Sequence, residues 1–139
     1  MSRSQELVDA VLDIVGDRAE AEVSADVGTS SLTRFANSYI HQNVSEEVAS
    51  VTLRVARDGR VASATSTVTT PDALHTFVGG NLDVAGQQPV DSDWPGVGGP
   101  VHPLPVDNWD HATAKAVPAE RAEAVKAFVD PGAGLEAAG

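Results

Sequence analysis

Residues 34–43, RFANSYIHQN, hold the densest group of side chains that could do chemistry. They supply a guanidinium, two aromatic rings, an imidazole and several amide or hydroxyl groups within ten positions, in a chain otherwise rich in alanine, valine and acidic residues. Such a set could form a catalytic constellation, a binding strand or an ordinary strand with polar faces. The other reactive residues and the elements around the segment decide between these interpretations.

The histidines do not have the spacing of a metal site. His41 begins HQNVSE, where Gln42 stands at the position of the general base in an H-E-x-x-H motif and no second histidine follows one helical turn later. His75, His102 and His111 are far apart in sequence, and each is more simply a surface or hydrogen-bonded histidine. The chain has no cysteine, which excludes disulfides, thiolate catalysis and cysteine-ligated zinc.

Other catalytic patterns are equally incomplete. There is no GxSxG nucleophile elbow, and the glycine-rich stretch at 96–100 lies between prolines that favour a turn. Glu46 and Glu47 are adjacent, so on a strand they point to opposite faces and make poor acid–base partners. A Ser/His/Asp triad assembles in space and stays open. A small hydrolase built on His41 with a hydroxyl neighbour is a weaker idea, which we dismiss. The residues alone show no complete active site.

Composition limits the class of protein. The 139 residues fit one domain, and the net charge of −11 without a basic cluster argues against nucleic-acid binding. Asp9 and Asp13 interrupt the apolar residues near the N-terminus, and no stretch is long and apolar enough to span a membrane. We therefore expect a cytoplasmic protein.

The first third of the chain predicts a helix followed by strands. Apolar residues at helical spacing indicate a helix capped by Ser4 and stopped by Gly16. Residues 18–27 alternate strictly between apolar and polar side chains, which predicts a half-buried strand. We expect a turn at 28–31 and a further strand segment at 32–44.

A hairpin is the clearest local feature. Asp58 and Gly59 form a two-residue turn signal that pairs Val55 with Ala62 when the flanking strands fold together. One face of this hairpin is then apolar and suited to lie under a helix, while the other is polar. The apolar face comprises Ala49, Val51, Leu53, Val55, Ala62, Ala64 and Val68.

A second helix begins at Thr70 and contains Gly79 and Gly80, which indicate either a break or a close backbone contact. Residues 86–117 form a Pro/Gly-rich extended arm, with Trp94 and Trp109 as its expected anchors. A third helix begins at Pro118. The order helix–strands–helix–arm–helix predicts a single α+β domain over 1–139, with a mainly antiparallel sheet of about four strands and helices packed on one face.

These elements bear on residues 34–43. Neither face of a regular strand would be cleanly apolar, so we expect a bulge or tight bend at Asn37-Ser38 that turns Phe35 and Ile40 inward. The polar side chains would then form a surface for peptide or subunit contact. They are Arg34, Asn37, His41 and Gln42.

Several stretches, in order, resemble the TldD/PmbA family. The residues are LTRFANSYIHQNVSEE at 32–47, VTLRVARDGRVASATS at 51–66, the helix from Thr70, and DSDWPG at 91–96. The RFANS stretch looks more like the PmbA/TldE branch. The resemblance implies an α/β N-terminal domain of a cytoplasmic metallopeptidase, followed by a β-rich C-terminal domain, in a family also labelled a modulator of DNA gyrase.

The resemblance further implies a heterodimer of TldD-type and PmbA-type subunits that acts on unfolded or small peptides. Zinc would be held by an H-E-x-x-x-H motif in the C-terminal domain of the TldD-type subunit. This chain is about one third as long as such proteins, ends near the expected end of the first domain, and has no such motif. We therefore assign it no catalytic residue, metal residue or cofactor, and expect a fragment or truncated relative that is inactive alone.

Two functional hypotheses follow. In the first, the chain is the N-terminal domain of a TldD/PmbA-type subunit that contributes to substrate passage and subunit contact without being catalytic. In the second, it is a stand-alone binding or scaffolding module with no connection to proteolysis. Neither expects contact with nucleic acid or a membrane.

Overall fold

The computed structural model describes residues 2–99, 101, 104–132 and 134–136. The chain forms two compact units, of which unit 1 takes residues 1–28 and 47–101 and unit 2 takes residues 29–46 and 102–139. Two long strands, β1 (Glu20–Ala36) and β2 (Tyr39–Arg57), contribute to both units.

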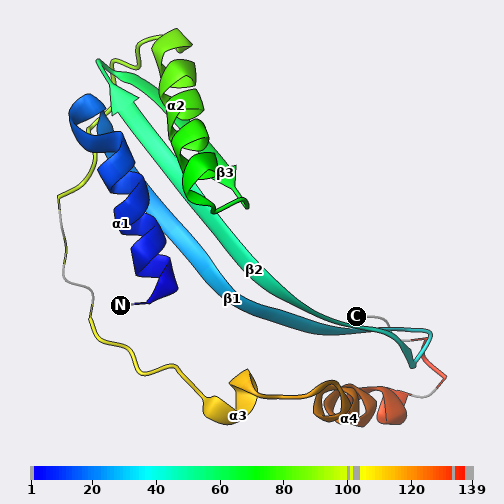
Figure 1. The fold of residues 1–139 in the computed structure, drawn as a ribbon. Helices are drawn as coiled ribbons and strands as arrows, with labels where there is room; N and C mark the ends of the chain where they lie inside the picture. Colours follow the sequence, from blue (N-terminus) through cyan, green and yellow to red (C-terminus); the bar gives the residue numbers. More distant parts are fainter. Residues whose placement is uncertain (1, 100, 102–103, 133, 137–139) are drawn as a thin grey trace. The chain divides into compact units, whose positions relative to one another are not determined.

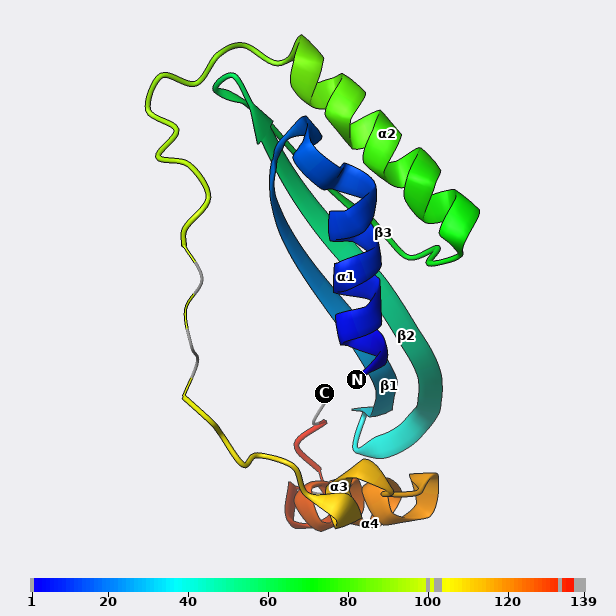
Figure 2. The ribbon, with the colours of Figure 1, turned by 60° about the vertical axis from the view of Figure 1, so that its left-hand side comes forward.

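Unit 1 is a sheet with two helices on one face. Helix α1 (Arg3–Val15) and the 3-10 helix η1 (Gly16–Arg18) precede β1, while β3 (Arg60–Ser66) and α2 (Pro71–Gln87) follow β2. The strand order is β1-β2-β3, with β2 and β3 antiparallel. Figures 1 and 2 show α1 and α2 side by side on the same face of this sheet. The predicted antiparallel α+β layer is confirmed.

The sheet has three strands among the described residues, where the sequence predicted about four. The predicted turn at 28–31 is wrong, because β1 continues through it. Gly28 does not adopt a left-handed conformation, and the Ser31 hydroxyl lies 2.8 Å from that of Ser45 on β2. Pairing with β2 therefore keeps this small and polar stretch extended.

The β2–β3 hairpin has the predicted register. Asp58 and Gly59 have φ angles of 53° and 70°, as a two-residue turn with two left-handed positions requires. Val55 pairs with Ala62 across the hairpin. A Cβ atom on Gly59 would lie 3.0 Å from the Val90 side chain, so this glycine is also favoured by close packing.

The core of unit 1 lies between the sheet and the two helices. Side chains of β2 alternate, so that Val51, Leu53 and Val55 are fully covered. Burying each such side chain contributes about 1.5–3 kcal/mol. The two helices and β3 supply the rest of the cluster, which comprises Leu7, Val11, Val15, Ala62, Leu74, Val78, Leu82 and Ala85.

One polar side chain enters this core. Asn81 on α2 is 4% exposed, and its amide nitrogen donates to the Leu53 carbonyl at 3.0 Å. The hydrogen bond offsets the cost of burying the amide and fixes α2 against the central strand.

Three details of unit 1 differ from the prediction. The helix cap is Ser2, whose hydroxyl accepts from the Gln5 amide, rather than Ser4. Val68 is 56% exposed because β3 ends at Ser66, so it does not belong to the apolar face. Helix α2 runs unbroken through Gly79 and Gly80, and a Cβ atom at either position would meet nothing within 4 Å.

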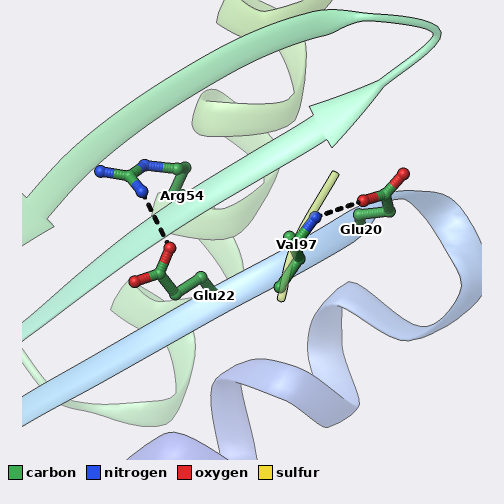
Figure 3. Close-up of polar contacts among 4 residues, drawn as sticks. All are labelled: Glu20, Glu22, Arg54 and Val97. Atoms are coloured by element: carbon green, nitrogen blue, oxygen red, sulfur yellow. Dashed lines mark hydrogen bonds and ion pairs between the residues drawn. The ribbon is translucent and has the colours of Figure 1, made fainter. Parts of the chain in front are cut away.

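The first part of the predicted arm is tied to unit 1. The Asp91 amide donates to the Gly59 carbonyl at 2.7 Å, and the Val97 amide donates to the Glu20 carboxylate at 2.9 Å (Figure 3). Trp94 is half-buried between these two attachment points. Trp109, expected to be a second anchor, is 74% exposed in unit 2.

Unit 2 combines the adjoining ends of β1 and β2 with three short elements. These are α3 (His111–Ala114), α4 (Pro118–Val129) and the 3-10 helix η2 (Asp130–Gly132). Proline is the first residue of α4, as the sequence predicts. The Asp110 carboxylate caps α3 by accepting from the Thr113 amide at 2.6 Å. This hydrogen bonding with Thr113 lowers the pKa of Asp110 below its usual value.

Candidate functional site: a polar hairpin tip

The segment 34–43 folds as the tip of a hairpin. Asn37 and Ser38 have φ angles of 51° and 60°, and they separate β1 from β2. Asparagine tolerates this left-handed conformation better than most residues, which explains why the chain turns here. The tight bend expected from the sequence is therefore present, and the ten residues form two strand ends joined by a turn.

The bend distributes the side chains as expected. Phe35 and Ile40 are half-buried. The four residues predicted to form a contact surface are all exposed, namely Arg34, Asn37, His41 and Gln42. Their exposure makes them available for contact, while their role in binding stays a prediction.

Polar contacts connect the two strands near the tip. The Arg34 guanidinium lies 3.5 Å from the Gln42 side-chain oxygen, at the long limit of a hydrogen bond. The Thr33 hydroxyl donates to the Asn43 side-chain oxygen one step further along. Successive residues of a strand point to opposite faces, so these two contacts lie on opposite faces of the hairpin. The contact with Gln42 leaves further donors of Arg34 available to bind an acceptor.

An aromatic pair lies beside the turn. The Tyr39 and His41 rings lie 6.5 Å apart in an edge-on arrangement. Tyr39 is 60% exposed and presents both a flat apolar ring and a hydroxyl group. A side chain of this kind suits contact with a peptide, because it offers large area at a low cost in conformational entropy.

Helix α4 packs against the half-buried side chains of the hairpin. The Phe35 and Phe128 rings are 5.7 Å apart and tilted by 59°. A cavity of about 240 Å³ lies between the tip and α4. Its walls are formed by Ser38, Tyr39 and Ile40 from the hairpin and by Ala122, Glu123, Val125, Lys126, Val129 and Asp130 from the helix and the residue after it.

This site has binding groups but lacks the donor set of a metal centre. Within the described ranges, no three histidine, cysteine or acidic side chains lie close enough to hold a metal ion. His41, His75 and His111 are exposed on separate elements, and His102 lies outside the described residues. The family resemblance led us to expect zinc in the C-terminal domain of a TldD-type subunit and not at these residues, so we derive no catalytic step through a metal here.

Comparison with known proteins finds a family that part of the chain resembles. Residues 21–79 match the model of PmbA/TldA metallopeptidase domain 1. This segment, which is less than half of the chain, is similar to that family. The match begins in β1, includes all of β2 and β3, and ends within α2 at Gly79. It therefore covers the polar hairpin tip and the sheet of unit 1. No curated protein matches the chain in sequence.

Two solved structures share the fold of this chain. TldE from Thermococcus kodakarensis matches with a TM-score of 0.72 and 15% identity, over 91% of this chain and 28% of that one. A Thermotoga maritima protein described as a candidate modulator of a DNA gyrase matches with a TM-score of 0.57 and 18% identity, over 88% of this chain and 27% of that one. The chain thus spans about a quarter of the length of these structural relatives.

Sequence reasoning located the polar residues but missed the exposed ring of Tyr39 and the cavity beside it. The amphipathic pattern of 118–129 shows that the helix has an apolar side, with Val129 only 6% exposed. The pattern of 118–129 does not indicate which hairpin this apolar side of the helix packs against. None of the described helices is long and apolar enough to cross a bilayer.

Proposed function

We propose that the chain is the first domain of a PmbA/TldE-type subunit of a metallopeptidase, and that it contributes to substrate passage and subunit contact without being catalytic. The observation that carries the proposal is the family match over 21–79, which contains the exposed polar hairpin tip. The fold shared with TldE favours the PmbA/TldE branch.

The hairpin tip has the chemistry expected of a surface for peptides or a subunit. Arg34 supplies a charged donor, Asn37 and Gln42 supply amide groups, and His41 lies against the Tyr39 ring. Amide and guanidinium groups can bind peptide carbonyls and carboxylates, and the adjacent cavity of about 240 Å³ can accept an apolar side chain.

The proposal that this chain is not catalytic rests on its amino-acid sequence. The metallopeptidase motif H-E-x-x-x-H is not found in the 139 residues, since no histidine is followed by glutamate. Metal-dependent hydrolysis would then be the task of a TldD-type partner, with zinc in the C-terminal domain of that partner. Location in the cytoplasm is part of the same proposal.

A binding experiment with matched variants tests this function. Replacing Arg34, His41 and Gln42 with alanine removes the polar side chains of the tip while keeping Asn37 in the turn. A control variant replaces three exposed residues of the same kinds outside the hairpin, which are Gln87, His111 and Lys115. We expect a TldD-type subunit to co-purify with the wild-type chain and the control, and to bind the hairpin variant at least about tenfold more weakly, a loss of about 1.4 kcal/mol.

Three results would contradict parts of the proposal. Equal retention of the TldD-type subunit by the hairpin variant and the control would remove the tip from the contact. Hydrolysis of an unfolded peptide by the purified chain alone, with stoichiometric bound zinc, would show that the chain has its own active site. Failure of a TldD-type subunit to bind the wild-type chain at all would favour a stand-alone binding or scaffolding module.

A further inference from the structure

A second cavity lies in unit 1, between the two helices that cover the sheet. Its volume is about 440 Å³, and it opens between α1 and the start of α2. It is lined by Arg3, Glu6, Leu7, Ala10, Asp13 and Ile14 from α1 and by Thr69, Pro71, Leu74 and His75 at and before α2. We call this feature the α1–α2 groove.

The floor of the α1–α2 groove is apolar. Leu7 and Leu74 form its deepest part, with exposures of 8% and 3%, and Ala10 and Ile14 are half-buried beside them. Leu7, Ala10 and Ile14 follow the three- and four-residue spacing of one helix face, so the floor extends for about two turns, roughly 10 Å, along α1. A groove of this form between two helices suits the apolar stripe of a third helix.

The wall on α1 is mainly acidic. Glu6 and Asp13 are exposed and seven residues apart, which places them two turns apart on the same side of the helix. Neither side chain makes an ion pair or a hydrogen bond with the residues that the structure describes. Among those residues, the only ion pair joins Arg54 to Glu22 (Figure 3). Arg3 is the single arginine or lysine of the groove and lies at its N-terminal end.

We propose that the α1–α2 groove binds a basic amphipathic helix from another polypeptide, with apolar side chains on the floor and lysine or arginine side chains against Glu6 and Asp13. We choose a basic partner because the wall of the groove on α1 is mainly acidic. The helices of this chain do not offer such a partner, because α1 and α2 are acidic and α4 carries two acidic and two basic residues. The proposal is independent of the role of the hairpin tip.

A designed peptide tests the groove directly. The probe is a peptide of about 14 residues, or roughly four helical turns, with leucine at helical spacing and lysine on both flanks. It is blocked at both ends, and its matched version carries glutamate in place of lysine. We expect the lysine peptide to bind the full chain with equimolar stoichiometry in calorimetry, and the glutamate peptide to bind at least about tenfold more weakly.

Charge variants separate the groove from the general acidity of the chain. The double change Glu6→Gln and Asp13→Asn should weaken binding about three- to tenfold, as expected for the loss of two solvent-exposed ion pairs. The control changes Asp17→Asn and Asp83→Asn remove the same charge from exposed positions of unit 1 outside the groove. The control should retain wild-type affinity, and Arg3→Gln should increase affinity.

A steric variant keeps the proposal falsifiable if the charge effects are small. Ala10→Phe fills the groove from α1, and it should abolish binding while the far-UV circular dichroism spectrum is unchanged. The proposal is overturned if the lysine peptide does not bind at millimolar concentration, or if both charge pairs weaken it equally. A dimer of the chain alone that Ala10→Phe dissociates would also overturn it, because the occupant would then be a second copy.

Discussion

Alanine at positions 79 and 80 should stabilise the protein. Both glycines lie in the middle of α2, where the backbone is helical. A Cβ atom at either position would meet nothing within 4 Å, and neither residue has a positive φ angle. Neither the packing of unit 1 nor the backbone conformation therefore requires glycine at these two positions. Each glycine makes folding less favourable, because it loses more backbone entropy than alanine.

The size of the effect follows from helix propensity. Glycine is about 0.8–1.0 kcal/mol less favourable than alanine in a helix interior, with slightly smaller values in some hosts. Gly79→Ala and Gly80→Ala should each add about 0.5–1 kcal/mol to the free energy of unfolding. The double variant should add about 1–2 kcal/mol, which corresponds to a rise in Tm of roughly 3–8 °C for a domain of this size.

Tryptophan fluorescence can follow unit 1 alone. The chain has two tryptophans, and in a Trp109→Phe background the half-buried Trp94 of unit 1 is the remaining one. Urea unfolding should show a higher midpoint with an unchanged slope for each alanine variant. A lower midpoint for either variant would refute the reasoning, since it would mean that the added methyl group meets an obstacle or that α2 is not helical at these positions.

Three further predictions concern single contacts. Asn81→Ala should lower the free energy of unfolding by about 1–3 kcal/mol, because a buried hydrogen bond to β2 is lost; an unchanged urea midpoint would contradict it. The exposed Glu22–Arg54 pair, 2.9 Å apart, should show a coupling of about 1 kcal/mol or less in a double-mutant cycle, and a clearly larger value would contradict its solvent screening. Hydrogen bonding with Thr113 lowers the folded pKa of Asp110, so the cap it provides is fully present above the usual pKa of an aspartate and is lost as pH falls through the lower folded pKa. The amide resonance of Thr113 should therefore move only below about pH 4, and a transition at higher pH would contradict the assignment.

Local turn chemistry made part of the fold predictable. The pair Asp58-Gly59 specifies both the turn type and the register, so the pairing of Val55 with Ala62 follows from the sequence alone. The stretch at 28–31 has turn-like residues but lies inside β1, because its partner is a strand more than ten residues away. Non-local pairing of this kind overrides local propensity.

The candidate site was also predictable only in its local features. The mixed polarity of 34–43 indicated a bend at Asn37-Ser38 and an exposed polar set, and both are present. The packing of α4 on the hairpin, through Phe35 and Phe128, brings together residues more than ninety positions apart. Such a contact has no local signature, so the cavity that it creates could not be inferred from spacing.

Amide hydrogen exchange in the presence of a TldD-type subunit tests the central claim most directly. The proposed function predicts that the subunit slows exchange at the exposed hairpin tip, residues 34–42, in the wild-type chain. It also predicts that the protection is lost when Arg34, His41 and Gln42 are replaced with alanine and is retained in the matched control. Protection that is confined to other segments, or that is the same in both triple variants, would contradict the claim that this tip is the contact surface.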